Sequence, residues 1–245
     1  MANTKLTTKD IALIVSFAPC YTILSFLPSF PIIGGVGKSI TAAVMISPVI
    51  GLLLNPSLSI LTIAIGGSVA FFMGAPGPFG PLSFLPHAAT AFCASLLSND
   101  KRNICLLTYI SLLLAFAFYP VIGPVWSWPL MVWMHLVGLV LLASPLLEKA
   151  IKILHEFKSS SEFVLSLFAI IFVAALYGHL AGSILFEIFY RLAFPGVEDW
   201  KNLWFALTFV YPLERIIITG AATLIAAGIM KALKTQLQNT LGGSG

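Results

Sequence analysis

The sequence predicts an all-α protein, a polytopic bundle of transmembrane helices in the cell membrane. Of its 245 residues, 59% are hydrophobic and only 9% are charged, whereas about 25% of the residues of an ordinary soluble domain are charged. The mean hydropathy of +1.01 is typical of a chain that crosses a bilayer several times. The lipid bilayer is therefore an expected partner, and residues 1–241 are expected to form a single integral membrane domain.

A third observation is the regular succession of apolar segments, which Pro, Gly or charged residues separate. About eight such segments can be recognised, at 11–27, 39–54, 57–73, 82–97, 104–119, 130–147, 163–190 and 203–233. The third and fourth are the weakest, so the expected number lies between six and eight. The last segment is expected to be interrupted at Pro212, because proline kinks or breaks a helix. The Pro/Gly-rich stretch 74–81 is either an exposed turn or a re-entrant loop.

The positive charges predict the orientation of the chain. With eight segments and both termini in the cytoplasm, nine Lys and Arg residues lie inside and three outside, as the positive-inside rule requires. The inside set is Lys5, Lys9, Lys101, Arg102, Lys149, Lys152, Lys158, Lys231 and Lys234, and the outside set is Lys38, Arg191 and Lys201. Because these charges are scattered among loops, no nucleic-acid partner is expected. The tail Gly242–Gly245 is typical of an artificial linker and is left out of the fold.

A polar stripe runs along the seventh apolar segment. His179, Ser183, Glu187 and Arg191 follow one another at intervals of four residues, which places them near one face of a helix. Ionisable side chains within a bilayer usually face a partner or a cavity, so His179, Ser183 and Glu187 are predicted to line a ligand site. The alternative is that Glu187 and Arg191 form a local ion pair at the end of the helix.

Other candidate ligand-binding residues lie near the predicted outer side. Trp126 and Trp128 belong to an outer loop, although tryptophan also favours the membrane interface without any ligand. His135 lies within the sixth segment. Arg215 follows Glu214 in the last segment, where the pair either faces a ligand or marks the outer end of the helix. The segment 28–38 is expected to act as a lid over the site.

Motifs for catalysis, metal binding and cofactor binding are absent from the sequence. The stretch around Lys38 resembles a phosphate-binding loop, but the first glycine of that motif would have to stand where Ile32 does. The three cysteines have no metal-binding or redox spacing. We therefore predict no catalytic residue, no metal and no cofactor. An intramembrane enzyme that uses His179 and Glu187 remains an alternative.

Small residues form two candidate docking faces for a partner. Ala12, Ser16 and Cys20 recur every four residues in the first segment, and Gly178 and Gly182 form a GxxxG pair in the seventh. Both patterns allow another membrane helix to approach closely.

The order of features along the chain resembles the substrate-binding S component of energy-coupling factor (ECF) vitamin transporters. The resemblance covers about half of the chain, in the stretches Gly34–Ser39, Pro48–Pro56 (PVIGLLLNP), Ile65–Ala70, Phe79–Leu97 and Tyr211–Lys234. It implies a subunit that binds a small solute from the outer side and docks onto a transmembrane coupling subunit with ATPases. The first-helix small-residue face would be the docking face. The family has six helices, whereas eight segments are recognised here. The alternatives are an intramembrane or lipid-modifying enzyme, and a non-catalytic assembly subunit that uses the GxxxG pair.

Overall fold

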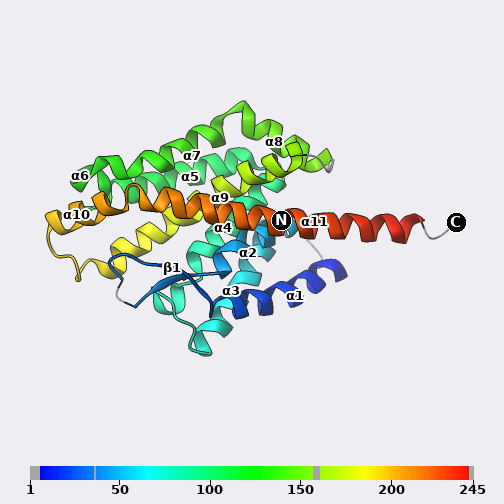
Figure 1. The fold of residues 1–245 in the computed structure, drawn as a ribbon, viewed down its shortest axis with the longest axis horizontal. Helices are drawn as coiled ribbons and strands as arrows, with labels where there is room; N and C mark the ends of the chain where they lie inside the picture. Colours follow the sequence, from blue (N-terminus) through cyan, green and yellow to red (C-terminus); the bar gives the residue numbers. More distant parts are fainter. Residues whose placement is uncertain (1–5, 36, 157–160, 243–245) are drawn as a thin grey trace.

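The computed structural model describes residues 6–35, 37–156 and 161–242, with side chains as far as residue 233. Lys5, Lys158, Gly243–Gly245 and the side chain of Lys234 lie outside this described part. The fold is nearly all-α, as the composition predicts, with one short hairpin (Figure 1). The elements are α1 (Thr8–Leu24), β1 (Pro28–Pro31), β2 (Ser39–Thr41), α2 (Ala43–Leu53), α3 (Pro56–Phe72), η1 (Gly80–Leu82), α4 (Leu85–Ser98), α5 (Arg102–Ala117), α6 (Pro124–Ser127), η2 (Pro129–Val132), α7 (Trp133–Ala143), α8 (Pro145–Glu156), α9 (Ser161–Tyr190), α10 (Val197–Leu207) and α11 (Val210–Gly242).

Helix α9 is the centre of the bundle. It packs against α4, α5, α7, α8 and α11, while α4 also packs on α2 and α3 (Figure 1). The pair α1 and α3 completes the layer on the other side of α4. Small residues allow these helices to approach closely: a Cβ on Gly66 of α3 would lie 2.6 Å from the carbonyl oxygen of Ala18 in α1.

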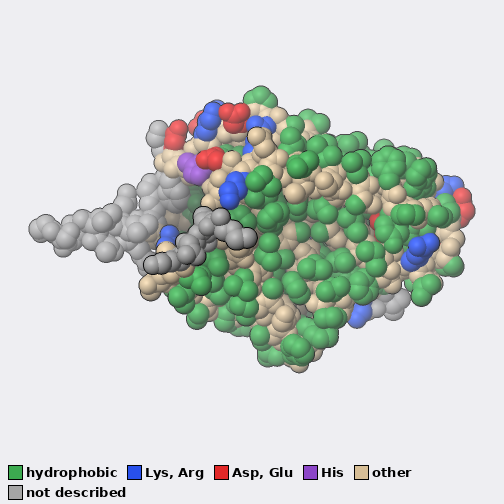
Figure 2. Space-filling view, turned by 180° about the vertical axis from the view of Figure 1, so that it is seen from behind, with side chains coloured by type: hydrophobic (Ala, Val, Ile, Leu, Met, Phe, Trp, Pro, Cys, Tyr) green, Lys and Arg blue, Asp and Glu red, His purple; other side chains and the backbone are tan. Residues whose placement is uncertain are grey.

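Charged side chains gather at the two ends of the molecule, with an apolar surface between them (Figure 2). At one end Glu148 pairs with Arg102 and Lys152, and His155 lies beside Asp100. The opposite end carries the pair of Lys201 with Glu198, together with exposed Lys38 and Arg191. This arrangement is typical of a protein whose middle faces lipid.

Two helices are long and apolar enough to cross a membrane, namely α9 over Ser161–Tyr190 and α11 over Val210–Leu233. A third crossing results if α7 and α8, which are bent by 61°, are taken as one span. Eight full spans are therefore not shown. The reason is length: the 11 residues of α2 reach only about 16 Å, roughly half of the hydrocarbon thickness.

The predicted sixth segment, 130–147, is divided by a bend. α7 ends at Ala143, and Pro145 begins α8 at a position that needs no backbone donor. Arg102 donates from Nε to the carbonyl oxygen of Leu142 and from Nη2 to that of Ser144, both at 2.8 Å. The guanidinium thus satisfies carbonyl groups that the broken helix leaves unpaired.

The predicted interruption at Pro212 is also displaced. The chain breaks between α10 and α11, after Leu207, and Pro212 is the third residue of α11. Proline is tolerated in the first turn of a helix because the amide groups there have no helical acceptor.

The segment 28–38, which is the expected lid, contains a strand. β1 and β2 pair antiparallel, with Phe30 opposite Ile40 and Pro31 opposite Ser39. The turn between them uses Gly34 and Gly37 at φ values of +86° and +67°, a conformation that only glycine adopts readily. This hairpin is difficult to predict from the sequence, because both strands are short and β1 begins and ends with proline.

Candidate ligand-binding cavity

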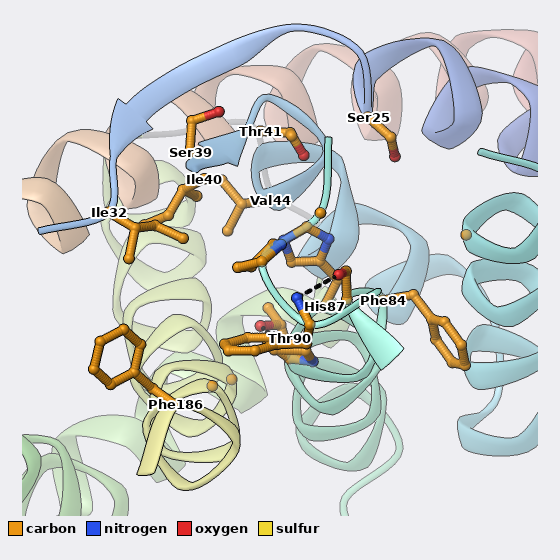
Figure 3. Close-up of a pocket in the computed structure, with 18 of the residues that line it drawn as sticks. Ser25, Ile32, Ser39, Ile40, Thr41, Val44, Phe84, His87, Thr90 and Phe186 are labelled. Atoms are coloured by element: carbon orange, nitrogen blue, oxygen red, sulfur yellow. Dashed lines mark hydrogen bonds between the residues drawn. The ribbon is translucent and has the colours of Figure 1, made fainter. Parts of the chain in front are cut away.

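A cavity of about 130 Å³ lies where α1, α3, α4, α9 and α11 meet beneath the hairpin. Figure 3 shows the hairpin passing over it, with Ser39 and Thr41 above and His87 and Thr90 of α4 below. Phe186 of α9 closes one side. The loop 75–81, with three prolines, lines a further part of the wall. The cavity therefore combines a rigid helical base with a cover made of two non-helical segments.

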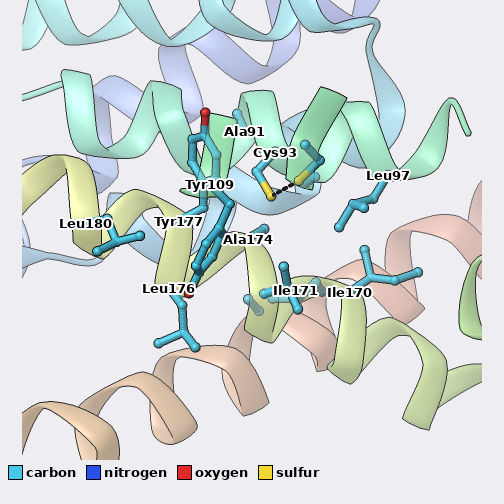
Figure 4. Close-up of a cluster of buried hydrophobic side chains, with 14 of the residues drawn as sticks. Ala91, Cys93, Leu97, Tyr109, Ile170, Ile171, Ala174, Leu176, Tyr177 and Leu180 are labelled. Atoms are coloured by element: carbon cyan, nitrogen blue, oxygen red, sulfur yellow. Dashed lines mark hydrogen bonds between the residues drawn. The ribbon is translucent and has the colours of Figure 1, made fainter. Parts of the chain in front are cut away.

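The helical base owes its shape to close contacts between α4 and α9. A Cβ on Gly178 would overlap Oγ1 of Thr90 and lie 2.6 Å from the carbonyl oxygen of Pro86. Behind this contact is a dense buried core of α4, α5 and α9 (Figure 4). There the sulfur atoms of Cys93 and Cys105 lie 3.1 Å apart. Such packing fixes the positions of the side chains that face the cavity.

Two hydrogen bonds organise the wall formed by α1 and α4. The Tyr21 hydroxyl and Nδ1 of His87 bond to each other, and the Thr90 hydroxyl donates to the carbonyl oxygen of Pro86 at 3.1 Å. Tyr21 is 2% exposed and Thr90 is 2% exposed. Their polar groups are thus satisfied within the protein, as buried polar groups must be.

His179 lies on the α9 side of the cavity and connects it to a second histidine. Its Nδ1 is 3.3 Å from Nε2 of His135 in α7, and the two rings are nearly parallel. The ring of Tyr211 meets His179 edge-on with centroids 4.6 Å apart. His135 is fully buried and its Nδ1 has no hydrogen-bond partner. It lies behind His179 and does not line the cavity.

Arg215 enters the cavity from the first turns of α11. Its side chain is 5% exposed, and its Nη2 donates to Oε2 of Glu214 at 3.3 Å. The guanidinium lies over the ring of Tyr211, 5.9 Å from its centroid. Arg215 and Glu214 are therefore buried, although they lie near the start of α11, at one end of its apolar span.

Three of the predicted ligand-binding residues, His179, Ser183 and Arg215, line this cavity. Glu187 does not. Four residues advance a helix by about 400°, so the stripe turns by about 40° at each step, and its later members leave the cavity. Glu187 is fully buried, and neither carboxylate oxygen has a hydrogen-bond partner. Arg191 is exposed, and the described residues include no ion pair between it and Glu187.

The two predicted tryptophans also lie away from the cavity. Trp126 is 55% exposed and meets the ring of Phe118 edge-on. Trp128 donates from Nε1 to the hydroxyl of Thr208 at 3.0 Å. Trp128 fits the interfacial interpretation of tryptophan, in which the ring is apolar and the N–H group finds a polar partner, and the exposed ring of Trp126 also suits a membrane interface.

The two candidate docking faces differ in the structure. Ala12 and Ser16 of α1 are exposed and Cys20 is half-buried, so this face is free within the described chain. The GxxxG pair is not a free face. Gly178 meets Thr90, and a Cβ on Gly182 would lie 3.5 Å from Pro86, both in α4 of the same chain. The close approach that GxxxG predicts is thus made by α4 and not by a partner.

Several cavity residues were not predicted from the sequence. Tyr21, His87, Thr90 and Tyr211 come from three helices, and Ser39 comes from the hairpin. Only Pro86-His87, a proline and histidine within an apolar segment, gave a local signal. The others became neighbours through folding.

The part of the chain that the structure describes contains no cluster of three His, Cys, Asp or Glu residues that could hold a metal ion. Comparisons with known protein families, with curated proteins and with solved structures find no match. The functional argument therefore depends on the cavity itself.

Proposed function

We propose that this protein binds a small solute from the outer side of the cell membrane, as the substrate-specific subunit of an ECF-type uptake system. The observation that carries this proposal is the cavity beneath the hairpin, whose base joins helices from the beginning, middle and end of the chain. A concave, largely apolar site with a few convergent polar groups is the usual form of a small-molecule site.

The cavity lies toward the end of the molecule that the positive-inside rule assigns to the outside. The hairpin and α10 belong to that end, whereas the ion pairs of Glu148, Arg102 and Lys152 belong to the other (Figures 1 and 2). In this proposal the shorter helices complete a multi-pass bundle of six to eight segments. Cysteine-accessibility labelling in intact cells tests it: Lys101→Cys and Lys152→Cys should react only from the cytoplasm, and Trp126→Cys and Glu198→Cys only from outside. Labelling of positions 101 and 126 from one side would contradict the topology.

Solute binding is tested by mass spectrometry of small molecules that remain in the purified protein. Ser183 is 5% exposed and lines the cavity, so Ser183→Phe should fill the cavity and remove the bound solute. Ser111→Phe is the matched control, because Ser111 is exposed on α5, away from the cavity. A retained molecule that both variants keep equally would contradict binding at this site.

The exposed small-residue face of α1 supports docking onto a transmembrane coupling subunit. A leucine at position 16 would hold a facing helix away and remove the close packing that drives association in lipid. Ser16→Leu should therefore reduce co-purification of a coupling subunit with its ATPases, while Ser111→Leu should not, and neither should change solute binding. Unchanged co-purification, or no such partner in native membranes, would contradict the ECF assignment.

The geometry gives less support to the other two functions. An enzyme that uses His179 and Glu187 needs the two side chains to act together, but His179 bonds to His135 and the oxygens of Glu187 have no partner. An assembly subunit that docks through GxxxG needs that face to be free, but α4 covers it.

A further inference from the structure

The cavity contains a positive charge that no acidic side chain of its wall balances. Arg215 is the only formally charged side chain among the described residues that line it. Glu214 takes one hydrogen bond from Arg215 but is not part of the wall. A guanidinium has five N–H donors, and the bond from Nη2 to Glu214 is the only one that Arg215 makes among the described residues. Because a buried donor that stays unpaired is costly, the remaining donors of this side chain favour a ligand acceptor.

Three other polar side chains of the helical base are already engaged. His87 bonds to Tyr21, Thr90 donates to a carbonyl oxygen of its own helix, and His179 bonds to His135. Arg215 is thus the strongest recognition group that the helical base offers to a ligand.

The size and walls of the cavity limit the rest of the ligand. A volume of about 130 Å³ is close to that of an engineered cavity of about 150 Å³ that holds one benzene molecule. The rings of Phe84, Phe186 and Tyr211 contribute to the walls, and aromatic walls favour a flat ring through offset or edge-on contacts.

From these observations we propose that the solute is a ring compound of about one-ring width that carries a carboxylate, which Arg215 binds within the cavity. This inference rests on the proposed function, since it names the chemical class that the same site takes. Arg215 pairs readily with a carboxylate because two N–H groups in one plane can meet two oxygens, and such charge-assisted bonds are stronger than neutral ones.

The test uses three probes that share one ring and differ in charge, namely benzoate, benzamide and benzylamine. The full chain, purified in a neutral detergent, is titrated with each probe by ligand-observed NMR, after removal of any retained solute. We expect benzoate to bind at least about tenfold more tightly than benzamide, and benzylamine to bind most weakly. The inference would be overturned if benzamide or benzylamine bound as tightly as benzoate or more tightly. It would also be overturned if none of the three probes bound.

Substitutions then test whether Arg215 causes the preference for benzoate over benzamide. Arg215→Gln should remove the advantage of benzoate over benzamide, and Arg191→Gln, an exposed arginine that is not part of the cavity, should keep it. Because Arg215→Gln leaves Glu214 buried without its partner, the double variant Glu214→Gln/Arg215→Gln is included, which removes both charges. Persistence of the preference for benzoate in the double variant would overturn the role of Arg215.

The outcome also separates this inference from the proposed function. A retained solute that Ser183→Phe displaces but that has no anionic group would overturn the carboxylate class and leave solute binding intact. If the unsubstituted protein neither retains a solute nor binds any of the three probes, both proposals are contradicted.

Discussion

Helices α9 and α11 have similar hydropathies, but α9 is mostly buried within the protein and α11 is mostly exposed on its surface. Both are long and apolar, with mean hydropathies of 2.3 and 1.9 in their most apolar windows, yet 72% of the α9 window is buried and only 28% of the α11 window. α9 packs against other helices on several sides, whereas α11 lies at the periphery with exposed Leu224 and Ile216. Hydropathy thus identifies a helix that could cross a membrane without telling whether protein or lipid would surround it, because lipid chains are as apolar as leucine.

The polar side chains of the two helices show a second contrast. On α9, Glu187 is buried with both oxygens unpaired, and on α11, Glu214 is buried in a pair with Arg215. Removing a carboxylate should therefore have opposite consequences in the two helices. Matched substitutions can test each part of this comparison.

The largest effect is expected for the two glutamates. Glu214→Leu should lower the free energy of unfolding by about 3–5 kcal/mol, because it leaves Arg215 charged and unpaired in the interior. Glu187→Leu should instead raise it, by about 1 kcal/mol, because it removes a buried polar group that has no partner. Reversible unfolding in detergent with increasing denaturing surfactant measures both. A strong loss of stability in Glu187→Leu would mean that the carboxylate has a partner in the membrane.

A smaller effect is expected for a leucine pair. Leu176 of α9 is fully buried and Leu224 of α11 is 73% exposed. Leu176→Ala should cost roughly 2–3 kcal/mol, in the lower part of the range for buried leucines, since a cavity forms but lipid replaces water as the solvent. Leu224→Ala should change stability little. Equal losses would show that α11 has a protein neighbour, such as a second copy or a partner subunit, under the conditions used.

The smallest effect is expected for a glycine pair. Gly178→Ala places a methyl group against Thr90 and Pro86 of α4 and should cost about 1–2 kcal/mol through overpacking. A Cβ on Gly220 of α11 would meet no neighbouring atom within 4 Å, so Gly220→Ala should leave stability unchanged or raise it slightly, because alanine favours helices. Thermal unfolding of the two variants in one detergent compares them. A neutral Gly178→Ala would indicate that α4 can move away from α9.

Local signals in the sequence determined most of the helical elements. Continuous apolar runs located the helices α1 to α5, α9 and α11, and Asn55-Pro56 marked the start of α3, where the Asn55 side chain accepts from the amide of Leu58 at 3.0 Å. These features depend on residues within one or two turns of each other, so a sequence reveals them directly. The bend at Ser144 was missed because the guanidinium that stabilises it comes from α5, 42 residues away.

The candidate site was predictable only in part for the same reason. Helical spacing predicted that His179 and Ser183 share one face of a helix. The position of Arg215 within an apolar segment made it a candidate ligand-binding residue. These local patterns could not show that the stripe turns away before Glu187, that His135 lies behind His179, or that the GxxxG pair meets α4. The sequence by itself determined that this is a helical protein with polar groups placed in apolar helices. Only the tertiary structure decided which of them share a cavity, because that depends on how helices far apart in the chain rotate and pack against one another.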